Sequence, residues 1–147
     1  MICEIDFKSA QTIWSQGLWK DSVVWKKKYS KKEINNNFDN YLAQLTISYW
    51  VYKDGEDVVG INSGYVSTKN YFRSRGLWVS YKYRGQGIYK LLLDKAIEKS
   101  VRYKCKYIWS YPRKESLFAY EKVGFKKQGG FIKDTFGLNC MVIKEND

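Results

Sequence analysis

The chain has 147 residues, of which 44% are hydrophobic and 18% aromatic, so it can form one domain with a buried core and is not disordered. Its net charge of +11 favours a polyanionic partner such as nucleic acid, a membrane surface or a phosphorylated cofactor, or else reflects the Lys, Asn, Ile and Tyr codons of an AT-rich genome. Histidine is absent, which excludes a Ser-His-Asp triad, a Cys-His pair and histidine-based zinc sites, and leaves carboxylates, Tyr, Cys, Lys, termini or water as acids and bases.

The N-terminal third is expected to form a strand and two helices. Residues 2–7 alternate weakly and predict a first strand, and Ser9 is a candidate N-cap for a helix over 10–19. The segment 25–45 begins polar and basic. Apolar residues then recur at steps of three and four, which predicts a second helix; they are Ile34, Phe38, Tyr41, Leu42 and Leu45.

The middle of the chain predicts an antiparallel meander of three strands. Residues 46–53 are rich in β-branched and aromatic side chains, and the Asp54-Gly55 pair that follows is typical of a hairpin turn. Residues 58–67 and 76–81 continue the strand pattern. The segment 68–75 between them is either a loop or an extension of a strand.

From residue 88 the period changes to that of a helix. Two apolar rows at i, i+4 spacing face a charged row, which predicts an amphipathic helix of about four turns. These rows are Ile88, Leu92 and Ala96; Tyr89, Leu93 and Ile97; and Lys90, Asp94 and Glu98.

The C-terminal third predicts a strand, a short helix and two final strands. The strand covers 106–111 and ends at Pro112, and the helix covers 115–122 with Gly124 as its C-terminal cap. The final strands cover 124–133 and 136–143, and Gly129-Gly130 predicts a bulge or turn.

The cysteine spacing and the lack of a membrane span or secretory signal indicate the location of the protein and whether it binds a metal. The three cysteines are odd in number and widely spaced, which fits neither a disulfide framework nor a metal knuckle and favours reduced thiols. No apolar run could cross a membrane, and MICEIDFKSAQ lacks the pattern of a secretory signal. We expect a cytoplasmic protein of a single domain over residues 1–147, with no membrane association and no metal.

The stretch Arg84-Gly85-Gln86-Gly87 lies between a predicted strand and a predicted helix. The first N–H groups of a helix have no internal partner and lie at its positive end, and glycine lets the backbone approach an anion closely. This junction therefore suits a diphosphate, although a plain strand-to-helix turn would use glycine as well. A dinucleotide-binding fingerprint requires a third glycine where Lys90 stands, and the P-loop pattern is also missing.

Two stretches resemble motifs of the GCN5-related N-acetyltransferases. LWVSYKYRGQGIYKLLL (77–93) is similar to the family's Q/R-x-x-G-x-G/A motif, with Arg84 at its first position and Gly87 at its fourth. SLFAYEKVGF (116–125) resembles a second motif through Ser116, Tyr120 and the Gly124-Phe125 pair. The spacing of the motifs and the order of elements also match the family, over roughly residues 46–144.

The resemblance implies an α/β (α+β) GNAT-like fold, with a mixed central sheet of six or seven strands, an antiparallel N-terminal meander and four helices. It implies transfer of an acetyl group from acetyl-CoA to a primary amine. The cofactor's pantetheine arm would pair with the backbone of Leu77, Trp78 and Val79. Tyr120 would be the general acid that protonates the leaving thiolate, although packing in the core would also explain it. The loop that would hold the pyrophosphate comprises Arg84, Gly85, Gln86, Gly87, Ile88, Tyr89 and Lys90.

The sequence departs from the family pattern at three positions. Tyr89 occupies the last Gly/Ala position of the first motif, Tyr81 stands where many members have Pro, and Arg113 stands where members often have Asn. The predicted strand KYIWSY also lacks the glutamate that many members use as the general base. Glu56, Asp57 and Glu115 are alternatives, and each is also explained as a solvated turn or first-turn carboxylate, so a water relay or an acceptor with a low pKa is favoured.

The acceptor is an unidentified amine, either a small molecule or a protein, and the protein is a monomer or a homodimer. Aromatic residues of the N-terminal half would line an acceptor pocket or belong to the core; they are Trp14, Trp19, Trp25, Tyr29, Tyr49, Trp50 and Tyr52. The positive charge disfavours a polyamine acceptor. An alternative function is a non-catalytic module that binds nucleic acid through its basic, aromatic surface, including the run WKKKYSKK (25–32).

Overall fold

The structure is a computed structural model that describes residues 1–20, 26, 28, 39–134 and 137–147. The described residues form a seven-stranded mixed sheet in the order β1-β2-β3-β4-β5-β7-β6, and among its strands only β4 and β5 are parallel neighbours. The strands are β1 (Ile2–Ile5), β2 (Ser48–Asp54), β3 (Asp57–Thr68), β4 (Tyr71–Val79), β5 (Tyr107–Ser110), β6 (Lys126–Asp134) and β7 (Gly137–Glu145).

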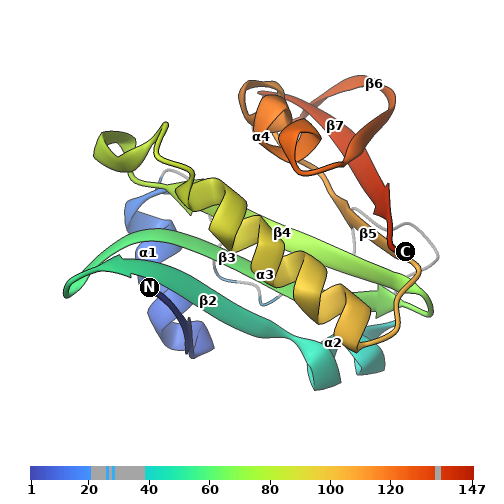
Figure 1. The fold of residues 1–147 in the computed structure, drawn as a ribbon, viewed down its shortest axis with the longest axis horizontal. Coiled ribbons are helices and arrows are strands. Elements are labelled where there is room, and N and C mark those ends of the chain that lie inside the picture. Colours follow the sequence, from blue (N-terminus) through green and yellow to red (C-terminus); the bar gives the residue numbers. More distant parts are fainter. Residues whose placement is uncertain (21–25, 27, 29–38, 135–136) are drawn as a thin grey trace.

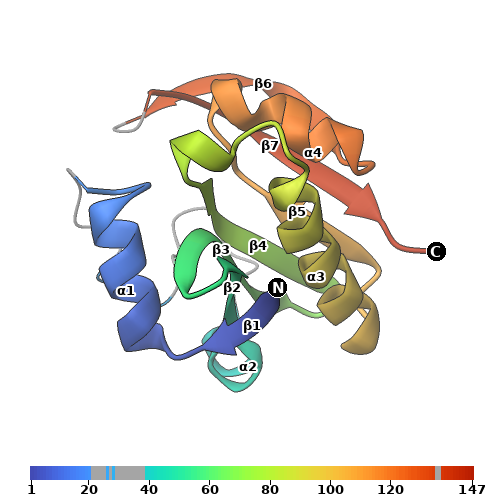
Figure 2. The same cartoon turned by 60° about the vertical axis from the view of Figure 1, so that its left-hand side comes forward.

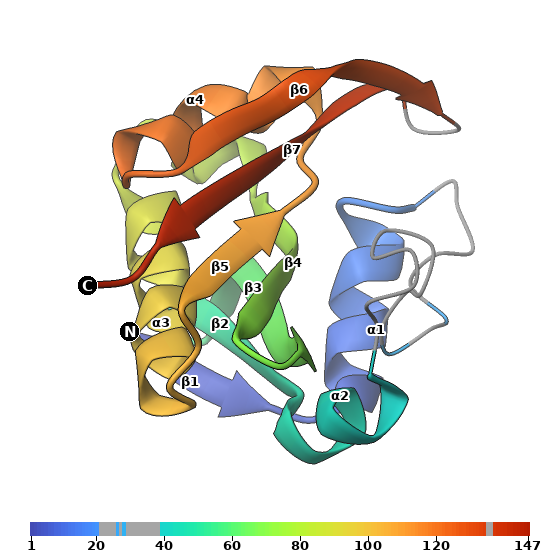
Figure 3. The ribbon, with the colours of Figure 1, turned by 90° about the vertical axis from the view of Figure 1, so that its right-hand side faces the viewer.

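Helices cover both faces of this sheet. In the described residues the α-helices are α1 (Phe7–Gln16), α2 (Asn40–Thr46), α3 (Ile88–Arg102) and α4 (Leu117–Lys122), with 3-10 turns η3 (Tyr81–Tyr83) and η4 (Lys114–Ser116). Helix α3 runs across the front of the sheet in Figure 1. Figures 2 and 3 show α1 on the opposite face, and α4 beside β6 and β7. The predicted fold class, with its mixed sheet, meander and four helices, is therefore confirmed.

The first helix begins earlier than the sequence predicted. Asp6, rather than Ser9, is the N-cap of α1, and its carboxylate accepts the Ser9 backbone N–H at 2.8 Å. Hydrogen bonding with the Ser9 side chain, and then with its backbone N–H, lowers the pKa of Asp6, because both contacts favour the charged form. Aspartate and serine side chains can both cap a helix by accepting the free backbone N–H groups of its first turn. Because Asp6 takes this role three residues before Ser9, the helix predicted over 10–19 is observed at Phe7–Gln16.

The second helix is short, and its buried face differs from the predicted one. Tyr41 and Leu45 are 69% and 62% exposed, whereas Ala43 and Thr46 are buried. The hydroxyl of Thr46 donates to a carbonyl within α2 and accepts the backbone N–H of Val66 in β3 at 2.8 Å, so this polar face docks on the sheet. Residues 34 and 38 of the predicted apolar row lie outside the described residues.

The predicted meander is confirmed. The segment 68–75, for which the sequence allows a loop or a strand extension, mostly extends the strands, since β3 ends at Thr68 and β4 begins at Tyr71. Gly55 lies in the β2–β3 turn with φ of 62°, as the Asp54-Gly55 pair predicted. Strand β4 then begins at Tyr71, directly after a tight turn at Asn70. At the other end of the chain, the register of β6 against β7 shifts between Gln128 and Ile132, which confirms the predicted bulge.

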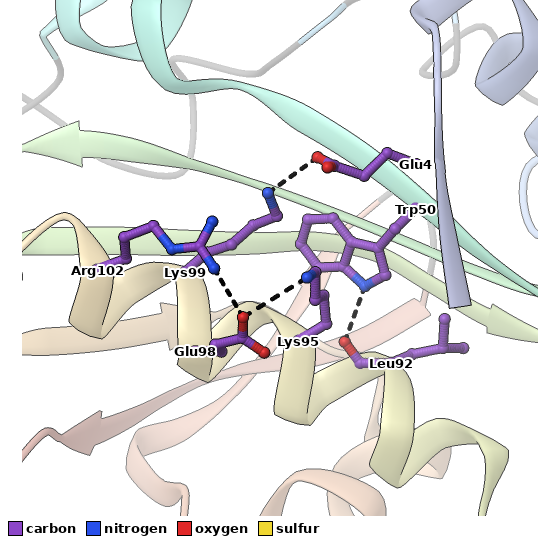
Figure 4. Close-up of polar contacts among 7 residues, drawn as sticks. All are labelled: Glu4, Trp50, Leu92, Lys95, Glu98, Lys99 and Arg102. Atoms are coloured by element: carbon purple, nitrogen blue, oxygen red, sulfur yellow. Dashed lines mark hydrogen bonds and ion pairs between the residues drawn. The ribbon is translucent and has the colours of Figure 1, made fainter. Parts of the chain in front are cut away.

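Polar contacts fasten α3 to the first two strands (Figure 4). The Lys99 ammonium on α3 is buried and lies 2.9 Å from the Glu4 carboxylate on β1, and this hydrogen bond lowers the pKa of Glu4. The indole N–H of Trp50 on β2 donates to the Leu92 carbonyl at 2.9 Å. These contacts hold the helix across the sheet, so the direction of its N-terminal end is fixed. None of the described helices is long and apolar enough to cross a bilayer.

Candidate active site

Strands β4 and β5 separate after a short parallel ladder. Their pairing covers Tyr71–Arg73 and Tyr107–Trp109, after which β4 continues to Val79 with no further β5 partner in the described part of the chain. We call the end of this ladder, at Arg73–Ser74 and Trp109–Ser110, the β4–β5 fork. Beyond it, no strand among the described residues pairs with this edge of β4, although side chains of the chain itself already donate to the Ser74, Gly76 and Val79 carbonyls.

A bulge in β4 contributes to this divergence. The register of β3 against β4 shifts between Ile61 and Ser63, and opposite the shift Gly76 has a φ of 83°. A Cβ atom on Gly76 would lie 2.5 Å from the Trp14 ring, whose indole N–H donates to the Gly76 carbonyl at 2.9 Å. Because bulges bend strands, this close contact with α1 helps to direct the end of β4 away from β5.

The glycine turn after β4 opens α3 with backbone conformations that other residues rarely adopt. Gly85 and Gly87 have φ of 79° and 81°, and Gly87 is the N-cap of α3. A Cβ atom built on either glycine would meet nothing within 4 Å. The open space beside these glycines, next to the orphan N–H groups of a 15-residue helix, suits an anion that approaches the backbone.

Arg84 is already engaged within this turn. Its Nε donates to the Val79 carbonyl at 2.9 Å, and its guanidinium lies 5.7 Å from the centre of the Tyr81 ring. Tyr83 in η3 donates to the Asp54 carboxylate at 3.0 Å, which raises the pKa of Tyr83 and ties the turn to the β2–β3 hairpin. The turn that contains the predicted phosphate-binding residues is thus anchored to the sheet at two points.

The other residues predicted for the cofactor site lie on β4 or at the start of α3. Leu77 and Val79 pack against the core cluster that contains Leu92 and Tyr120, whereas Trp78 packs with α1 on the opposite face. Gln86 is exposed in the turn, and Lys90 forms an ion pair with Asp94 one helical turn away. Ile88 is buried, so only its backbone is available to a ligand.

Tyr89 brings the two motifs into contact. Its ring meets the edge of the Phe118 ring on α4 at 6.2 Å between centroids. The first turn of α3 therefore lies beside the helix that carries Tyr120. This orientation accounts for a tyrosine at a position where the family usually has a small residue, because the ring points toward α4.

A helix cap fixes Tyr120. The N–H of Phe125 donates to the Tyr120 carbonyl at 3.1 Å and the N–H of Gly124 donates to the Glu121 carbonyl at 3.1 Å, while Gly124 has a φ of 102°. This pair of hydrogen bonds is a Schellman motif, and its usual hydrophobic contact is the edge-to-face pair of Tyr120 and Phe125 at 5.4 Å. The Gly-Phe pair after α4 therefore orients the tyrosine.

The Tyr120 hydroxyl lies at the β4–β5 fork. Tyr120 is 3% exposed, and its oxygen is 3.3 Å from Oγ of Ser110, the last residue of β5. Ser110 donates to the Ser74 carbonyl on β4 at 2.7 Å, and Arg73 donates to the Ser110 Oγ at 3.0 Å. Arg73, Ser74 and Ser110 were not among the predicted site residues, because a strand pattern does not reveal which strands separate.

The remaining candidates from the sequence lie elsewhere. Glu56, Asp57 and Glu115 are exposed, which fits their interpretation as solvated carboxylates. Arg113 donates to the Leu18 carbonyl at 3.2 Å, at the end of the α1 region. Lys26 and Lys28 are exposed, and the rest of the basic run 25–32 lies outside the described residues.

The aromatic residues of the N-terminal half mostly form core. Trp14, Tyr49 and Trp50 are buried, and Trp19 and Tyr52 are half-buried. Residues 25 and 29 are not described. Trp14 and Trp19 lie over the guanidinium of Arg75 on β4, at 5.9 and 5.0 Å from their ring centres.

Comparisons with known proteins concern the family and the fold. The family described as Acetyltransferase (GNAT) family matches residues 12–125. The chain is similar to the IAA acetyltransferase from Bacillus cereus ATCC 14579, with 16% identity, a TM-score of 0.69 and coverage of 99% of both chains. It is also similar to an acetyltransferase of the GNAT family from Staphylococcus aureus Mu50, with 17% identity, a TM-score of 0.69 and coverage of 99% and 98%.

A third structure was solved with a ligand. It is a GNAT family acetyltransferase from Elizabethkingia anophelis with acetyl-CoA bound, 17% identical, with a TM-score of 0.59 and coverage of 80% of this chain and 84% of that one. No protein among the curated ones matches the chain.

Proposed function

Because the chain belongs to the acetyltransferase (GNAT) family, we propose that it transfers an acetyl group from acetyl-CoA to a primary amine, with Tyr120 as the general acid. The observation that carries this proposal is the proximity of two features. An anion-suited glycine turn opens α3, and α4 beside it holds the Tyr120 hydroxyl at the fork between β4 and β5. A diphosphate and a thioester on one extended ligand would need both features.

The described residues fit acetyl-CoA. The open space beside Gly85 and Gly87 leaves room for a pyrophosphate, and past Arg73 no described strand pairs with the β4 edge along which the pantetheine arm would lie, at Leu77–Val79. When bound, acetyl-CoA supplies an activated acetyl group and a thiolate leaving group. Residues proposed to hold the cofactor are those of the β4 edge and the turn: Leu77, Trp78, Val79, Arg84, Gly85, Gln86, Gly87, Ile88, Tyr89 and Lys90.

Tyr120 suits the role of proton donor in position and in chemistry. A phenol with an ordinary pKa of about 10 can protonate a leaving thiolate. Burial of Tyr120 keeps bulk water away from this proton, and the cap at Gly124 and Phe125 holds the ring in one orientation. The reaction therefore gains a donor that does not need to move.

The acceptor amine must lose a proton before or during attack. An alkylamine with a pKa of about 10.4 is neutral in only about one molecule in 2,500 at pH 7. The carboxylates that the sequence suggested as alternative bases are exposed in the structure; they are Glu56, Asp57 and Glu115. We therefore propose that solvent removes the proton, or that the acceptor, a small molecule or a protein, carries an amine of low pKa. We propose a cytoplasmic monomer or homodimer.

Two measurements test this function. Calorimetric titration with acetyl-CoA should show micromolar binding that Gly87→Glu abolishes, because a carboxylate in the open space would repel the pyrophosphate. Release of free CoA thiol should then be followed over a panel of primary amines. Tyr120→Phe, which keeps the ring beside Phe125, should slow turnover about 10²–10⁴-fold while acetyl-CoA affinity is retained.

The opposite results would reject the proposal. Absence of acetyl-CoA binding at low salt would show that the glycine turn holds no cofactor. Unchanged turnover in Tyr120→Phe would remove the tyrosine from the reaction while leaving the cofactor site in place.

A further inference from the structure

Three buried polar side chains from three elements meet at the β4–β5 fork. Arg73 on β4, Ser110 on β5 and Tyr120 on α4 are 3%, 2% and 3% exposed. Oγ of Ser110 lies 3.0 Å from Nη1 of Arg73 and 3.3 Å from the phenol oxygen of Tyr120. Ser110 is therefore a bridge between a permanent cation and the hydroxyl proposed to act as an acid.

The hydrogen atoms available decide the direction of these contacts. The hydroxyl of Ser110 has one proton, and the Ser74 carbonyl at 2.7 Å, which can only accept, takes it. Nη1 of Arg73 has two protons, which it gives to the Ser74 carbonyl at 2.8 Å and to the Ser110 Oγ. The same Ser110 hydroxyl is also within reach of the Tyr120 phenol oxygen, toward which it can donate a second and longer hydrogen bond of 3.3 Å.

That contact is longer than an ordinary hydrogen bond between hydroxyls, which measures about 2.7–2.8 Å. Ser110 is therefore only a weak hydrogen-bond donor to the neutral phenol. A phenolate at the same position would attract the Ser110 proton, because hydrogen bonds to a charged oxygen are shorter and stronger.

Ser110 can turn toward a phenolate without leaving a buried group unpaired. If its hydroxyl rotates from Ser74 to Tyr120, the Ser74 carbonyl still accepts the hydrogen bond from Nη1 of Arg73. The guanidinium also donates to Ser110, which polarises the serine O–H toward the new acceptor. The Arg73 guanidinium is itself held over the Trp109 ring at 4.6 Å, so the cation is fixed.

We propose that Arg73, acting through Ser110, stabilises the phenolate that Tyr120 becomes when it gives up its proton, and that both are positioning residues of the reaction. As a statement about catalysis, this rests on the proposed role of Tyr120. After the amine has formed its C–N bond to the acetyl carbon, the C–S bond to the CoA sulfur breaks, the O–H bond of Tyr120 breaks and the S–H bond of the CoA thiol forms. The Ser110 hydrogen bond moves at the same time from the Ser74 carbonyl to the phenolate. The acceptor amine releases one proton to solvent, and Tyr120 regains one from solvent.

Among the described residues, Tyr120 shares its core cluster with other titratable side chains. The described elements that share its buried cluster contribute thiols and phenols, which are ordinarily uncharged at pH 7; they are Tyr52, Tyr83, Tyr89, Cys105 and Cys140. Burial raises the pKa of the Cys140 thiol on β7 and so keeps it protonated. The charged neighbours of Tyr120 on α4, Glu121 and Lys122, are exposed to solvent.

The test follows ionisation of Tyr120 directly and needs neither cofactor nor acceptor. Tyrosines labelled with carbon-13 at the ring carbon that bears the hydroxyl give one NMR resonance each, and Tyr120→Phe identifies the resonance of Tyr120. Its titration midpoint is compared in the unaltered protein and in Ser110→Ala, over the pH range in which circular dichroism shows each protein folded. Ser100→Ala is the matched control, because Ser100 is equally buried but donates to the Ile97 carbonyl within α3.

Ser110→Ala should move the Tyr120 midpoint upward by one pH unit or more, a tenfold change in proton affinity, while Ser100→Ala leaves it in place. Arg73→Lys, which keeps the charge but loses the paired donors of Nη1, should move it in the same direction. An unchanged midpoint in Ser110→Ala would overturn the proposal. If Ser110→Ala does not fold, Ser110→Cys, with its weak donor, is held to the same comparison.

The result is separable from that of the proposed function. A shifted midpoint in a protein that does not bind acetyl-CoA would support the contact network and reject the enzyme. An unshifted midpoint in an active enzyme would reject the network alone. In an active enzyme, Ser110→Ala should also lower kcat while leaving acetyl-CoA affinity unchanged.

Discussion

Replacing Gly87 with alanine tests whether this glycine is needed only for its backbone conformation or also for binding a ligand. With a φ of 81°, alanine at this position is strained by about 1–2 kcal/mol, partly offset by a stiffer unfolded chain. We expect a net loss of about 1 kcal/mol in the free energy of unfolding, or about 3 °C in Tm. The new methyl group meets no protein atom within 4 Å, so any larger effect must come from a ligand.

A pyrophosphate on this turn would lose contacts when the methyl group is present. Loss of two charge-assisted hydrogen bonds from backbone N–H groups, at about 1.5 kcal/mol each, weakens binding roughly 100-fold. At a CoA concentration of about 100 Kd the unaltered protein gains about 2.7 kcal/mol, roughly 8 °C in Tm, whereas Gly87→Ala gains only about 0.4 kcal/mol, near 1 °C.

The control is Gly129→Ala, in the β6 bulge. Gly129 has a φ of 74°, and a Cβ there also meets nothing within 4 Å, so its backbone strain is matched to that of Gly87. Differential scanning fluorimetry with and without CoA compares the three proteins. Gly129→Ala should keep the full ligand-induced shift. If Gly87→Ala keeps it as well, the glycine turn does not contact the cofactor.

Three further predictions concern stability and reactivity. Glu4→Gln should cost about 1 kcal/mol at pH 7, a modest value because the carboxylate is largely exposed. Since the hydrogen bond from Lys99 lowers the pKa of Glu4, this difference is present above the unfolded value of 4.5 and should shrink as the pH falls through the folded value; equal costs in urea denaturation at pH 7 and pH 3.5 would contradict it. Burial raises the pKa of Cys105 to about 11, so iodoacetamide at pH 8 should alkylate it about 100-fold more slowly than an ordinary thiol, with Cys3→Ser used to remove the more accessible thiol from the mass spectrum. Gly124→Ala should cost about 1–2 kcal/mol through its φ of 102°, and a thermal melt unchanged from that of the parent protein would argue against the cap that orients the tyrosine.

The sequence predicted the elements best where one periodic face packs against one neighbour. Helix α3 has two complete apolar rows against the sheet, and its predicted start at Ile88 is the observed one. Helix α2 was predicted less well. Its apolar residues Tyr41 and Leu45 remain exposed, while Thr46 is buried because its hydroxyl satisfies a backbone N–H of β3. Periodicity cannot anticipate a polar side chain that is buried by a hydrogen bond to a distant strand.

The two motifs identified in the sequence lie beside each other in the structure. Local features of the sequence explain the conformation of each motif. A Schellman cap needs glycine at C′ and favours an apolar residue at C″, so the Gly-Phe pair after α4 encodes both the end of the helix and the orientation of Tyr120. In the same way, glycines at 85 and 87 encode a backbone that leaves helix N–H groups open. Each of these is a local property of fewer than ten residues.

The contacts of the Tyr120 hydroxyl are of a different kind. Arg73 and Ser110 are 37 residues apart and meet only because β4 and β5 run parallel for three pairs and then separate. Arginine is rarely buried without partners, so the sequence alone does not predict that an arginine in the middle of a strand is buried. The fork explains it. Where two parallel strands separate, the Ser74 carbonyl loses its partner strand, and the Arg73 guanidinium and Ser110 hydroxyl both donate to it. The divergence that ends the pairing of β4 with β5 therefore also requires polar side chains beside Tyr120.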